Sequence, residues 1–483
     1  MVIRDGRIED LGTGDLPGYD IGSDTLVLDL HDAMVLPAMC DAHMHLYQWS
    51  FSRKAVDLSK ASSMEEMVKI LKERLKEPEN DPFISSTGIL LGVDYDESVF
   101  HSPGRIDRKF LDEIFPYDPV VIRRICGHKA VVNNEAGKIL GSCMDIPENG
   151  ILMEDEAMGL SWKMKIPDEF KLSFVEESVE ELYSLGIIGG VDIIPEYLLE
   201  EHTNIFRKMG RSPDLAVSIV PEDGSRVKGS NNGIKNWEEG LPHLNDNCDD
   251  PTIVSFSKFF LDGSIGARTA SFHKDYIDGP SPGPLYTKEE LLERIFLSHQ
   301  NGLVPMIHVI GDRATGMVLD LIGEIDGPIR LEHAEGIRKE DLGKLNDPRV
   351  ALCLQPNFQG NWGGEGDLYE QALGLGRSEL NRFGDILKSS VHVCFGSDMM
   401  PVGPMYGIMS AMQHQEQGQS LTFSEALRSY TKESFRLSGL EREGGNGLHD
   451  GYSANITVFQ KDSLRPILTI KDGRIVHEGS GSF

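Results

Sequence analysis

The sequence predicts an α/β fold built around a largely parallel sheet. Apolar runs of strand length recur along the chain, and amphipathic helical patterns lie between several of them. Runs of this kind suit parallel strands that are covered on both faces. The runs are 34–39, 84–93, 119–125, 185–193, 215–220, 252–261, 303–310, 328–334, 350–356 and 391–398.

Three segments have clear helical patterns. In the first, "SSMEEMVKILKERLKE" (62–77), Ser63 stands three residues before Glu66, which is the spacing of a capping box. The apolar residues that fall on one face of this helix are Met64, Met67, Ile70, Leu71 and Leu75. The segments 287–302 and 421–439 are also amphipathic, and each ends in glycine.

The two chain ends differ from the α/β body in that they contain short strand-like pieces around glycine turns. The stretches "RDGRIEDLG" (4–12) and "KDGRIVHEG" (471–479) both contain a DGRI turn between two short strand-like pieces. Because the same motif occurs at both ends, we expect the ends to pair with each other in one small β domain beside the α/β body.

Composition bears on partners and location. The formal net charge of -30, from 77 acidic and 47 basic residues, repels nucleic acids and anionic membranes, so we expect neither as a partner. No uncharged apolar run reaches the roughly 18–20 residues of a membrane helix, and the first 20 residues do not form a signal peptide. The six cysteines are scattered without a CxxC pair, so we expect reduced thiols and a cytoplasmic location.

The segment "DAHMHL" (41–46) places His43 and His45 one residue apart. In a strand, residues i and i+2 point to the same side, so both imidazoles would converge at the C-terminal end of a strand. Sites in α/β folds are built at that end. Two partly exposed loop histidines would give the same pattern, so further metal ligands must be sought elsewhere in the chain.

Four more polar residues lie at or near the ends of separate strand candidates. They are Lys258, His308, His333 and Asp398. Each alone has a structural explanation, such as a hydrogen-bonded core histidine, a helix N-cap or a surface lysine. Burial of all of them is unfavourable unless they are paired or bind a metal, so together they predict a metal site.

The segments around these residues resemble motifs of the amidohydrolase superfamily, and in particular of its YtcJ-like branch. The resemblance spans nearly the whole chain, and the motifs that carry it are "PAMCDAHMH", "KFFLDGSIGARTA", "HVIGDRA", "RLEHAE" and "CFGSD". It implies a (β/α)8 barrel with a small β-sandwich domain. Ala38 departs from the glycine that is usual before the first barrel strand, and Asn455 departs from a usual aspartate near the C-terminus.

The resemblance also implies a domain layout. The barrel would comprise residues 37–49 and 179–448, and the composite β-sandwich residues 1–36 and 449–483. Residues 50–178 would form an inserted subdomain after strand one, near the barrel mouth. The runs that remain then number as strands two to eight. On this count Lys258, His308, His333 and Asp398 fall on strands four, five, six and eight.

The ligand set implied by the resemblance suggests two divalent metal ions, with zinc as the expected metal. The ligands would be His43, His45, Lys258, His308, His333 and Asp398. A buried lysine has a lowered pKa and can react with CO2, so Lys258 would bridge the metals as a carbamate. The metals would activate a water and polarise a carbonyl, while Asp398 would act as the catalytic residue that moves the water's proton to the leaving nitrogen. The expected reaction is hydrolysis of a C–N bond in a small-molecule amide, N-acyl, N-formyl or cyclic amide substrate.

Two arginines are candidates for substrate binding. Arg268 and Arg313 lie just past strands four and five, near the expected barrel mouth. Either they pair with a substrate carboxylate or they brace loops through Asp262 and Asp312.

Three further residues are substrate-binding candidates. His128 and Asn133, in the predicted insertion, resemble a family motif and would reach over the mouth as lids do, unless the insertion is purely structural. Trp362, in the segment after strand seven, is a candidate pocket wall.

Two alternative functions are weighed against this one. A mononuclear deaminase of the same superfamily would lack the lysine ligand and carry a glutamate shortly after the strand-five histidine, where this chain has "HVIGDRA". A non-catalytic metal-binding relative would have lost ligands, whereas all six positions are filled here. The sequence leaves the oligomeric state open, a homo-oligomer included.

Overall fold

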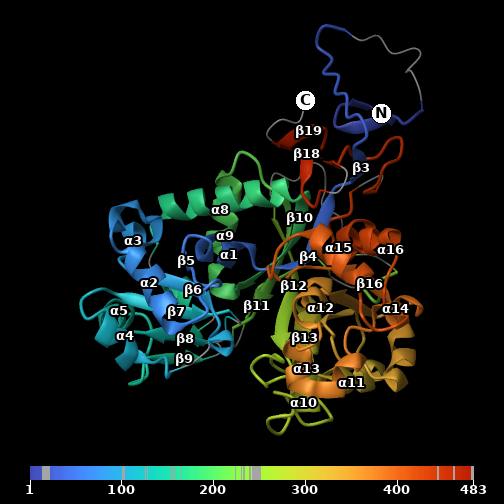
Figure 1. Ribbon diagram of the computed structural model, residues 1–483. Helices are drawn as coiled ribbons and strands as arrows, with labels where there is room; N and C mark the ends of the chain where they lie inside the picture. The colour runs from blue at the N-terminus through green and yellow to red at the C-terminus, as the bar shows by residue number, and fades with distance from the viewer. Residues whose placement is uncertain are drawn as a thin grey trace. The chain divides into compact units, whose positions relative to one another are not determined.

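Eight parallel strands form the main sheet of the computed structural model (Figure 1). In sheet order they are β4 (Met39–Met44), β10 (Ile187–Pro195), β11 (Asp214–Val220), β12 (Thr252–Phe260), β13 (Val304–Val309), β14 (Ile329–His333), β15 (Val350–Leu354) and β16 (His392–Phe395). Past the last strand, the N–H of Asp398 donates to the carbonyl of His43 at 2.8 Å, so the sheet closes on its first strand. The predicted (β/α)8 barrel is confirmed.

The structure describes residues 1–13, 22–100, 104–125, 127, 129–153, 156–157, 159–164, 166–222, 225–229, 231, 234–238, 241, 252–442, 445–460 and 463–479. The chain divides into two compact units. One contains Met1–His45 and Val179–Phe483, and the other contains Leu46–Ser178. The second unit is therefore inserted between strands β4 and β10 of the barrel sheet.

Helices follow most of the barrel strands. They are α8 (Asp168–Ser184), α9 (Leu199–Lys208), α10 (Lys288–Gln300), α11 (Asp312–Leu321), α12 (Pro356–Trp362), α13 (Leu368–Leu373), α14 (Phe383–Leu387), α15 (Pro404–Met412), α16 (Phe423–Tyr430) and α17 (Lys432–Leu437). Thr287 and Glu290 form a complete capping box at the start of α10. The single helix predicted over 421–439 was wrong, because Thr431, with φ -116° and ψ -97°, separates α16 from α17.

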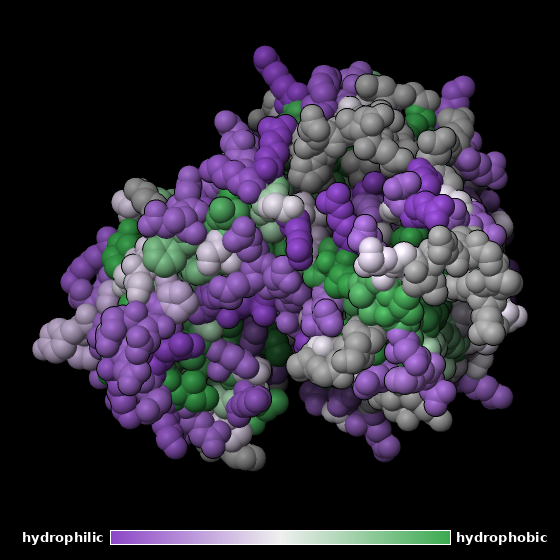
Figure 2. All heavy atoms as spheres, turned by 90° about the horizontal axis from the view of Figure 1, so that it is seen from above, coloured by the Kyte–Doolittle hydropathy of each residue, from purple (hydrophilic) through white to green (hydrophobic). Residues whose placement is uncertain are grey.

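Hydrophilic side chains predominate on the face seen in Figure 2, and hydrophobic atoms show in smaller areas between them. Across the described ranges, no helix has both the length and the apolar character needed to cross a membrane.

The two chain ends share a four-stranded antiparallel sheet. Its order is β19 (Arg474–Glu478), β18 (Pro466–Lys471), β17 (Ile456–Phe459) and β3 (Met34–Pro37). A separate hairpin of β1 (Val2–Arg4) and β2 (Arg7–Asp10) is joined to the C-terminal segment by the N–H of Gly451, which donates to the carbonyl of Ile8 at 2.7 Å. The predicted strand 34–39 was wrong as one strand, because its residues are divided between β3 and the barrel strand β4.

The two DGRI motifs form equivalent turns that pack against each other. Asp5 and Gly6 have φ of 50° and 78°, and Asp472 and Gly473 have φ of 49° and 73°. Two consecutive positive φ angles are typical of type I′ hairpin turns. A Cβ added to Gly473 would lie 2.8 Å from the Cα of Gly6, so the close approach of the turns requires glycine there.

We expect Asn455→Ala to lower the free energy of unfolding by about 1–2 kcal/mol and to leave turnover unchanged. The Oδ1 of buried Asn455 accepts the N–H of Asp472 at 2.7 Å, and alanine would leave that N–H without an acceptor. Urea unfolding and turnover of one preparation test this. Asn455→Asp keeps an acceptor oxygen and should stay close to wild type. A selective loss of activity at normal stability would contradict the prediction.

The inserted unit has its own sheet and core. Its strands, in sheet order, are β5 (Val56–Asp57), β6 (Leu90–Tyr95), β7 (Val120–Arg124), β8 (Lys129–Val132) and β9 (Ile151–Met153). Its helices include α1 (Leu46–Ser52), α2 (Met64–Arg74), α3 (Pro82–Thr87), α4 (Arg108–Ile114), α5 (Asn134–Leu140) and α7 (Leu160–Lys163). Buried residues of β6, β7 and α2, such as Leu90, Val120 and Leu71, belong to one hydrophobic cluster.

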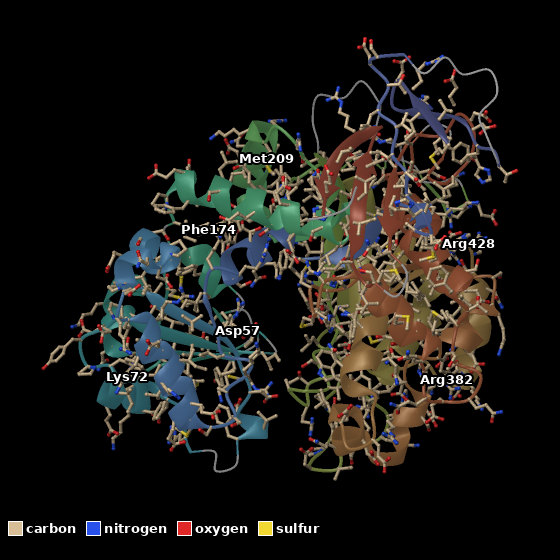
Figure 3. The ribbon with its side chains drawn as sticks, turned by 45° about the horizontal axis from the view of Figure 1, so that its top comes forward. Asp57, Lys72, Phe174, Met209, Arg382 and Arg428 are labelled. Atoms are coloured by element: carbon tan, nitrogen blue, oxygen red, sulfur yellow. The ribbon has the colours of Figure 1, made fainter. Side chains whose placement is uncertain are left out.

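Within this unit, two local predictions have different outcomes. Helix α2 begins where predicted, because Ser63 Oγ accepts the N–H of Glu66 at 3.1 Å. The strand predicted over 84–93 was wrong in its first half, since Gly88, with φ of 72°, ends helix α3 before β6 starts. Figure 3 shows Phe174, on the part of α8 that belongs to this unit; its ring lies 6.2 Å from that of Phe51 on α1.

Candidate metal centre

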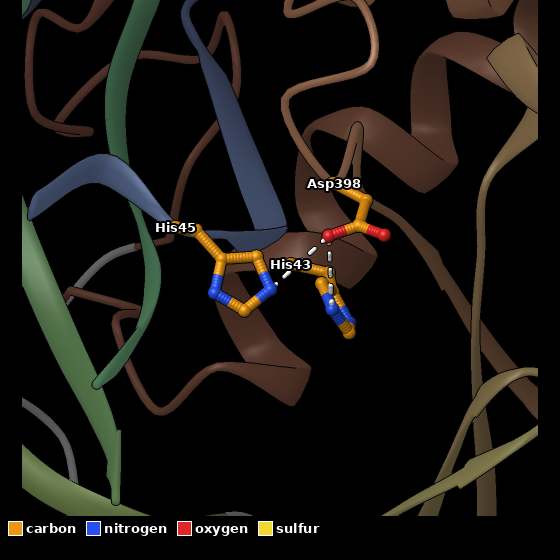
Figure 4. A group of neighbouring side chains, drawn as sticks. All are labelled: His43, His45 and Asp398. Atoms are coloured by element: carbon orange, nitrogen blue, oxygen red, sulfur yellow. Dashed lines mark ion pairs between the residues drawn. The ribbon is translucent and has the colours of Figure 1, made fainter. Parts of the chain in front are cut away.

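Three of the predicted ligands meet at the C-terminal end of the barrel. His43 lies near the end of β4, His45 directly follows that strand, and Asp398 lies three residues beyond β16. The Oδ1 of Asp398 is 3.2 Å from Nε2 of His45 and 3.6 Å from Nε2 of His43 (Figure 4). One ligand atom from each residue lies within 4.8 Å of the others, close enough for all three to bind one metal ion.

Two more imidazoles extend this group across the barrel. The ring of His333, at the end of β14, is centred 4.8 Å from the ring of His43 and 4.5 Å from that of His308 on β13. All three rings are buried. The structure therefore brings the histidines of strands one, five and six into one cluster.

Lys258, on β12, is buried, and its charge acts on His43, His333 and Asp398 of the same cluster. Its Nζ has no hydrogen-bond partner among the described residues and lies 5.3 Å from the ring centre of Phe260. Burial lowers the pKa of Lys258 to about 8, although nearby Glu332 and Asp398 oppose the shift. A buried ammonium without a partner is unfavourable, so this amine favours a neutral or chemically modified form.

His43 and His333 are held in the uncharged form that binds metals. Burial, followed by the charge of Lys258, lowers the pKa of His43 to about 4. Burial and the neighbouring imidazoles also hold the pKa of His333 well below its usual range. Burial would raise the pKa of Asp398, but His43, His45 and Lys258 lower it to about 2. At neutral pH His43 and His333 therefore offer uncharged imidazole nitrogens, and Asp398 offers an ionised carboxylate, as metal binding requires.

Sequence reasoning missed a carboxylate that orients His43. The Nδ1 of His43 lies 2.5 Å from Oε2 of Glu332, which is fully buried on β14. Burial would raise the pKa of Glu332, but Arg330 and the hydrogen bond with His43 lower it to about 2. An ionised carboxylate only accepts hydrogen bonds, so Nδ1 of His43 carries the proton and Nε2 keeps the free lone pair.

Arg330 forms a buried ion pair with Glu332. Its Nε donates to Oε1 of Glu332 at 2.7 Å, and its Nη2 donates to the carbonyl of Ala42 at 2.8 Å. Arg330 is fully buried in the barrel interior, where the guanidinium lies 4.7 Å from the ring centre of Phe256. A signal existed in the sequence, since Arg330 and Glu332 are two charged residues at i and i+2 in an otherwise apolar strand.

The junction of the first and last strands carries further buried polar contacts. Asp41 accepts hydrogen bonds from the N–H of Ser397 at 2.8 Å and from the N–H of His43 at 3.2 Å. Two predicted ligands have left-handed backbones, with φ of 67° at His333, the last residue of β14, and 52° at Asp398, beyond β16. Such conformations are uncommon outside glycine and cluster at functional sites.

Arg268 and Arg313 both contact neighbouring loops. The Nε of Arg268 donates to both carboxylate oxygens of Asp278 at 3.0 Å. Arg313 donates to the main-chain carbonyls of Pro282 at 3.3 Å and His273 at 3.5 Å. Both side chains therefore brace loops, which is one of the two interpretations of these residues.

The partners predicted for the two arginines were wrong. Asp262 accepts main-chain N–H groups instead, those of Ile310 at 3.0 Å and Gly311 at 2.8 Å. Asp312 accepts the N–H of His273 at 2.8 Å. Asp262 and Asp312 thus stabilise main-chain turns by accepting N–H groups. The spacing of residues in the sequence does not distinguish this role from an ion pair with arginine.

Asn133 makes structural contacts within the inserted unit. Its Oδ1 accepts the N–H groups of Ala136 at 2.9 Å and Val120 at 3.0 Å, and its Nδ2 donates to the carbonyl of Asp118 at 2.8 Å. The residue is fully buried and caps helix α5. These contacts support the structural interpretation of Asn133, while His128 lies outside the described residues.

Trp362 is linked to the metal centre through aromatic packing. Its ring is centred 4.8 Å from that of Phe358 on the same helix, α12. Phe358 in turn stacks on His333, with the centres 5.9 Å apart and the planes at 8°. The structure therefore places Trp362 one aromatic ring away from a predicted ligand.

Comparisons with known proteins agree with this geometry. The model of the Amidohydrolase family matches residues 26–478. The YtcJ protein of Bacillus subtilis (strain 168) is 26% identical, over 99% of this chain and 96% of its own length. The N-substituted formamide deformylase of Arthrobacter pascens is 22% identical, over 100% of this chain and 95% of its own length.

Solved structures are similar as well. The crystal structure of an uncharacterized metal-dependent hydrolase from Pyrococcus horikoshii OT3 has a TM-score of 0.71 and 27% identity, and it covers 94% of this chain and 91% of that chain. A second such hydrolase, from Pyrococcus furiosus, has a TM-score of 0.70 and 26% identity over 90% of this chain and 89% of that chain. Since the family model spans most of the sequence, this chain belongs to the Amidohydrolase family.

Proposed function

We propose that this metal-dependent hydrolase cleaves a C–N bond of a small-molecule amide, N-acyl, N-formyl or cyclic amide. The observation that carries the proposal is the convergence of His43, His45 and Asp398 at one end of the barrel, beside His308 and His333. The similarity to an N-substituted formamide deformylase supports the C–N bond as the type of bond cleaved.

The described side chains fit two divalent metal ions, and we propose zinc. The pKa values of His43 and His333 are lowered, Asp398 is ionised, and the buried amine of Lys258 has no partner among the described residues. As a carbamate, Lys258 would supply an anion with two oxygens between the ions and would no longer be a buried cation. Bound zinc supplies a water of lowered pKa and polarises the scissile carbonyl.

The residues of the chain perform the remaining steps. The carboxylate of Asp398 accepts a proton from the attacking water and delivers it to the leaving nitrogen, which would otherwise depart as an unstable anion. Glu332 fixes the ring of His43, so that Nε2 faces Asp398. Trp362 and Phe358 provide an apolar wall on the side of His333.

The test is a substrate screen on purified protein whose metal content has been measured. N-formyl, N-acyl and cyclic amides are tested beside amino-substituted heterocycles, with a chelator-treated sample as control. We expect turnover of at least one amide class, lost with chelation and restored by zinc. Turnover of the heterocycles alone, with release of ammonia, would favour a deaminase and contradict the proposal.

Reconstitution of metal-free protein should depend on pH through Lys258. Only the neutral amine reacts with CO2, and a pKa of about 8 makes that form the majority above pH 8, whereas an ordinary lysine would require a pH above 10. From pH 7 to 8.5 the neutral fraction rises roughly eightfold, and at a constant concentration of dissolved CO2 we expect the rate of activation by zinc to rise with it. Activation that is independent of pH and of dissolved CO2 would contradict the carbamate.

A further inference from the structure

A cavity of ≈ 750 Å³ lies at the other end of the barrel from the metal centre. Its lining includes residues 210–212, just before the start of β11, and residues 471–476 of the β18–β19 hairpin. The metal ligands follow the C-terminal ends of the strands, so this cavity is separate from them. Five basic side chains line it: Arg7, Arg211, Arg442, Lys471 and Arg474.

Part of this positive charge is neutralised inside the protein. Buried Asp214 accepts Nη2 of Arg442 at 2.8 Å and Nζ of Lys471 at 2.9 Å. Asp472 lies 3.3 Å from Nη2 of Arg442, and Asp5 also lines the cavity. Asp214, Asp472 and Asp5 thus offset part of the charge of the five basic groups, in a protein whose formal net charge is -30.

Two arginines of the lining, on different elements, have no carboxylate partner among the described residues. Arg211, on the loop before β11, and Arg474, on β19, have no ion pair or side-chain hydrogen bond within the described ranges. Both guanidiniums are exposed at the cavity. On a strongly acidic protein, unpaired guanidiniums on two segments that line the same cavity favour an anion that contacts both.

A buried donor in the lining is also unsatisfied. Tyr183, at the end of α8, is fully buried, and its hydroxyl has no hydrogen-bond partner among the described residues. Burial, and then the negative charge of Asp214, keep the pKa of Tyr183 above its usual value, so the hydroxyl retains its proton. An unpaired buried donor is unfavourable, and an acceptor within reach would stabilise it.

We propose that this cavity binds a small anion carrying two or more phosphate groups, which bridges Arg211 and Arg474. The planar guanidinium matches phosphate oxygens with two parallel hydrogen bonds, and two such groups suit a ligand with more than one phosphate. The volume lies within the range of small-molecule sites. Such a ligand would join the β18–β19 hairpin to the loop that leads into β11.

The test is calorimetric titration of the metal-loaded protein with tripolyphosphate, ATP and sulfate, in excess Mg²⁺ so that the phosphates do not strip metal from the protein. We expect saturable binding of tripolyphosphate, with sulfate much weaker. The double variant Arg211→Gln/Arg474→Gln should bind roughly tenfold to a hundredfold less tightly. ATP binding tighter than tripolyphosphate would assign the site to a nucleotide, and equal affinity would assign it to the phosphate chain alone.

Two controls make the outcome decisive. Arg105→Gln/Arg428→Gln removes the same charge from exposed arginines outside the cavity lining and should bind as wild type does. Asp398→Asn alters the metal centre and should also leave the affinity unchanged. Equal loss in both double variants, loss in Asp398→Asn, or no saturable binding at millimolar concentration would each overturn the proposal. Since Arg211 and Arg474 are exposed, melting without ligand should show that their variant is folded.

Discussion

Lys258→Ala should reduce turnover by about three orders of magnitude or more while the barrel stays folded. The proposed carbamate is the bridge between two cations, and without it their mutual repulsion is no longer screened. Metal content should therefore fall from about two ions toward one or fewer per chain. The substitution removes a buried amine that has no partner among the described residues, so stability should be retained or increased.

Metal analysis and turnover on the same preparation test this expectation. Lys208→Ala, an exposed change at the end of α9, is the matched control and should behave as wild type does. Acetate or formate can supply a carboxylate in the space left by the lysine, and partial rescue by either would support a bridging anion. A Lys258→Ala protein with full metal content and a near-normal rate would contradict the bridging carbamate. The site would then be mononuclear, held by four histidines and one aspartate.

Glu332→Gln should have two separate effects. It leaves the fully buried guanidinium of Arg330 without its carboxylate, which costs about 3–5 kcal/mol of stability when one member of a buried pair is removed. It also removes the ionised acceptor that fixes His43, and losing such a partner typically lowers metal affinity or activity about 10–100-fold. Denaturant unfolding and zinc titration measure the two effects independently.

A second substitution separates the structural role of Glu332 from its role at the metal. Arg330→Met in the Glu332→Gln background removes the unpaired charge, so much of the stability should return. The activity should not return, because His43 still lacks its ionised partner. Recovery of both properties together would show that Glu332 acts only through the fold.

The sequence predicted the strands of the parallel sheet well because their signals are local and repeated, and the resemblance to the amidohydrolase superfamily implied the barrel. Each strand is a short apolar run, and a polar residue at the end of several runs marks the edge where sites form. With 84–93 and 119–125 assigned to the insertion that the resemblance implied, counting the runs placed Lys258, His308 and His333 on the strands that the structure gives them. Errors arose where a single residue redirects the main chain, as Gly88 and Thr431 do, because hydrophobic patterns do not show such breaks.

The interior contacts were harder to predict for a different reason. Arg330 and Glu332 stabilise each other's charge only after β4 and β14 come together, so their burial depends on tertiary structure. The bonding partners of Arg268 and Asp262 depended on loop conformations that spacing does not determine. Residue type and strand position thus predicted which side chains gather, but not which of them bond to each other.

The contact between Asp41 and Ser397 has a consequence for biosynthesis. These residues are separated by 356 positions in the chain, and the predicted metal ligands His43 and Asp398 lie close to them in sequence. At typical synthesis rates of about 5–20 residues per second, the first ligands leave the ribosome roughly 20 to 70 s before the last one. A nascent chain therefore presents His43 and His45 without Asp398, and the proposed ligand set is complete only after Asp398 has been synthesised.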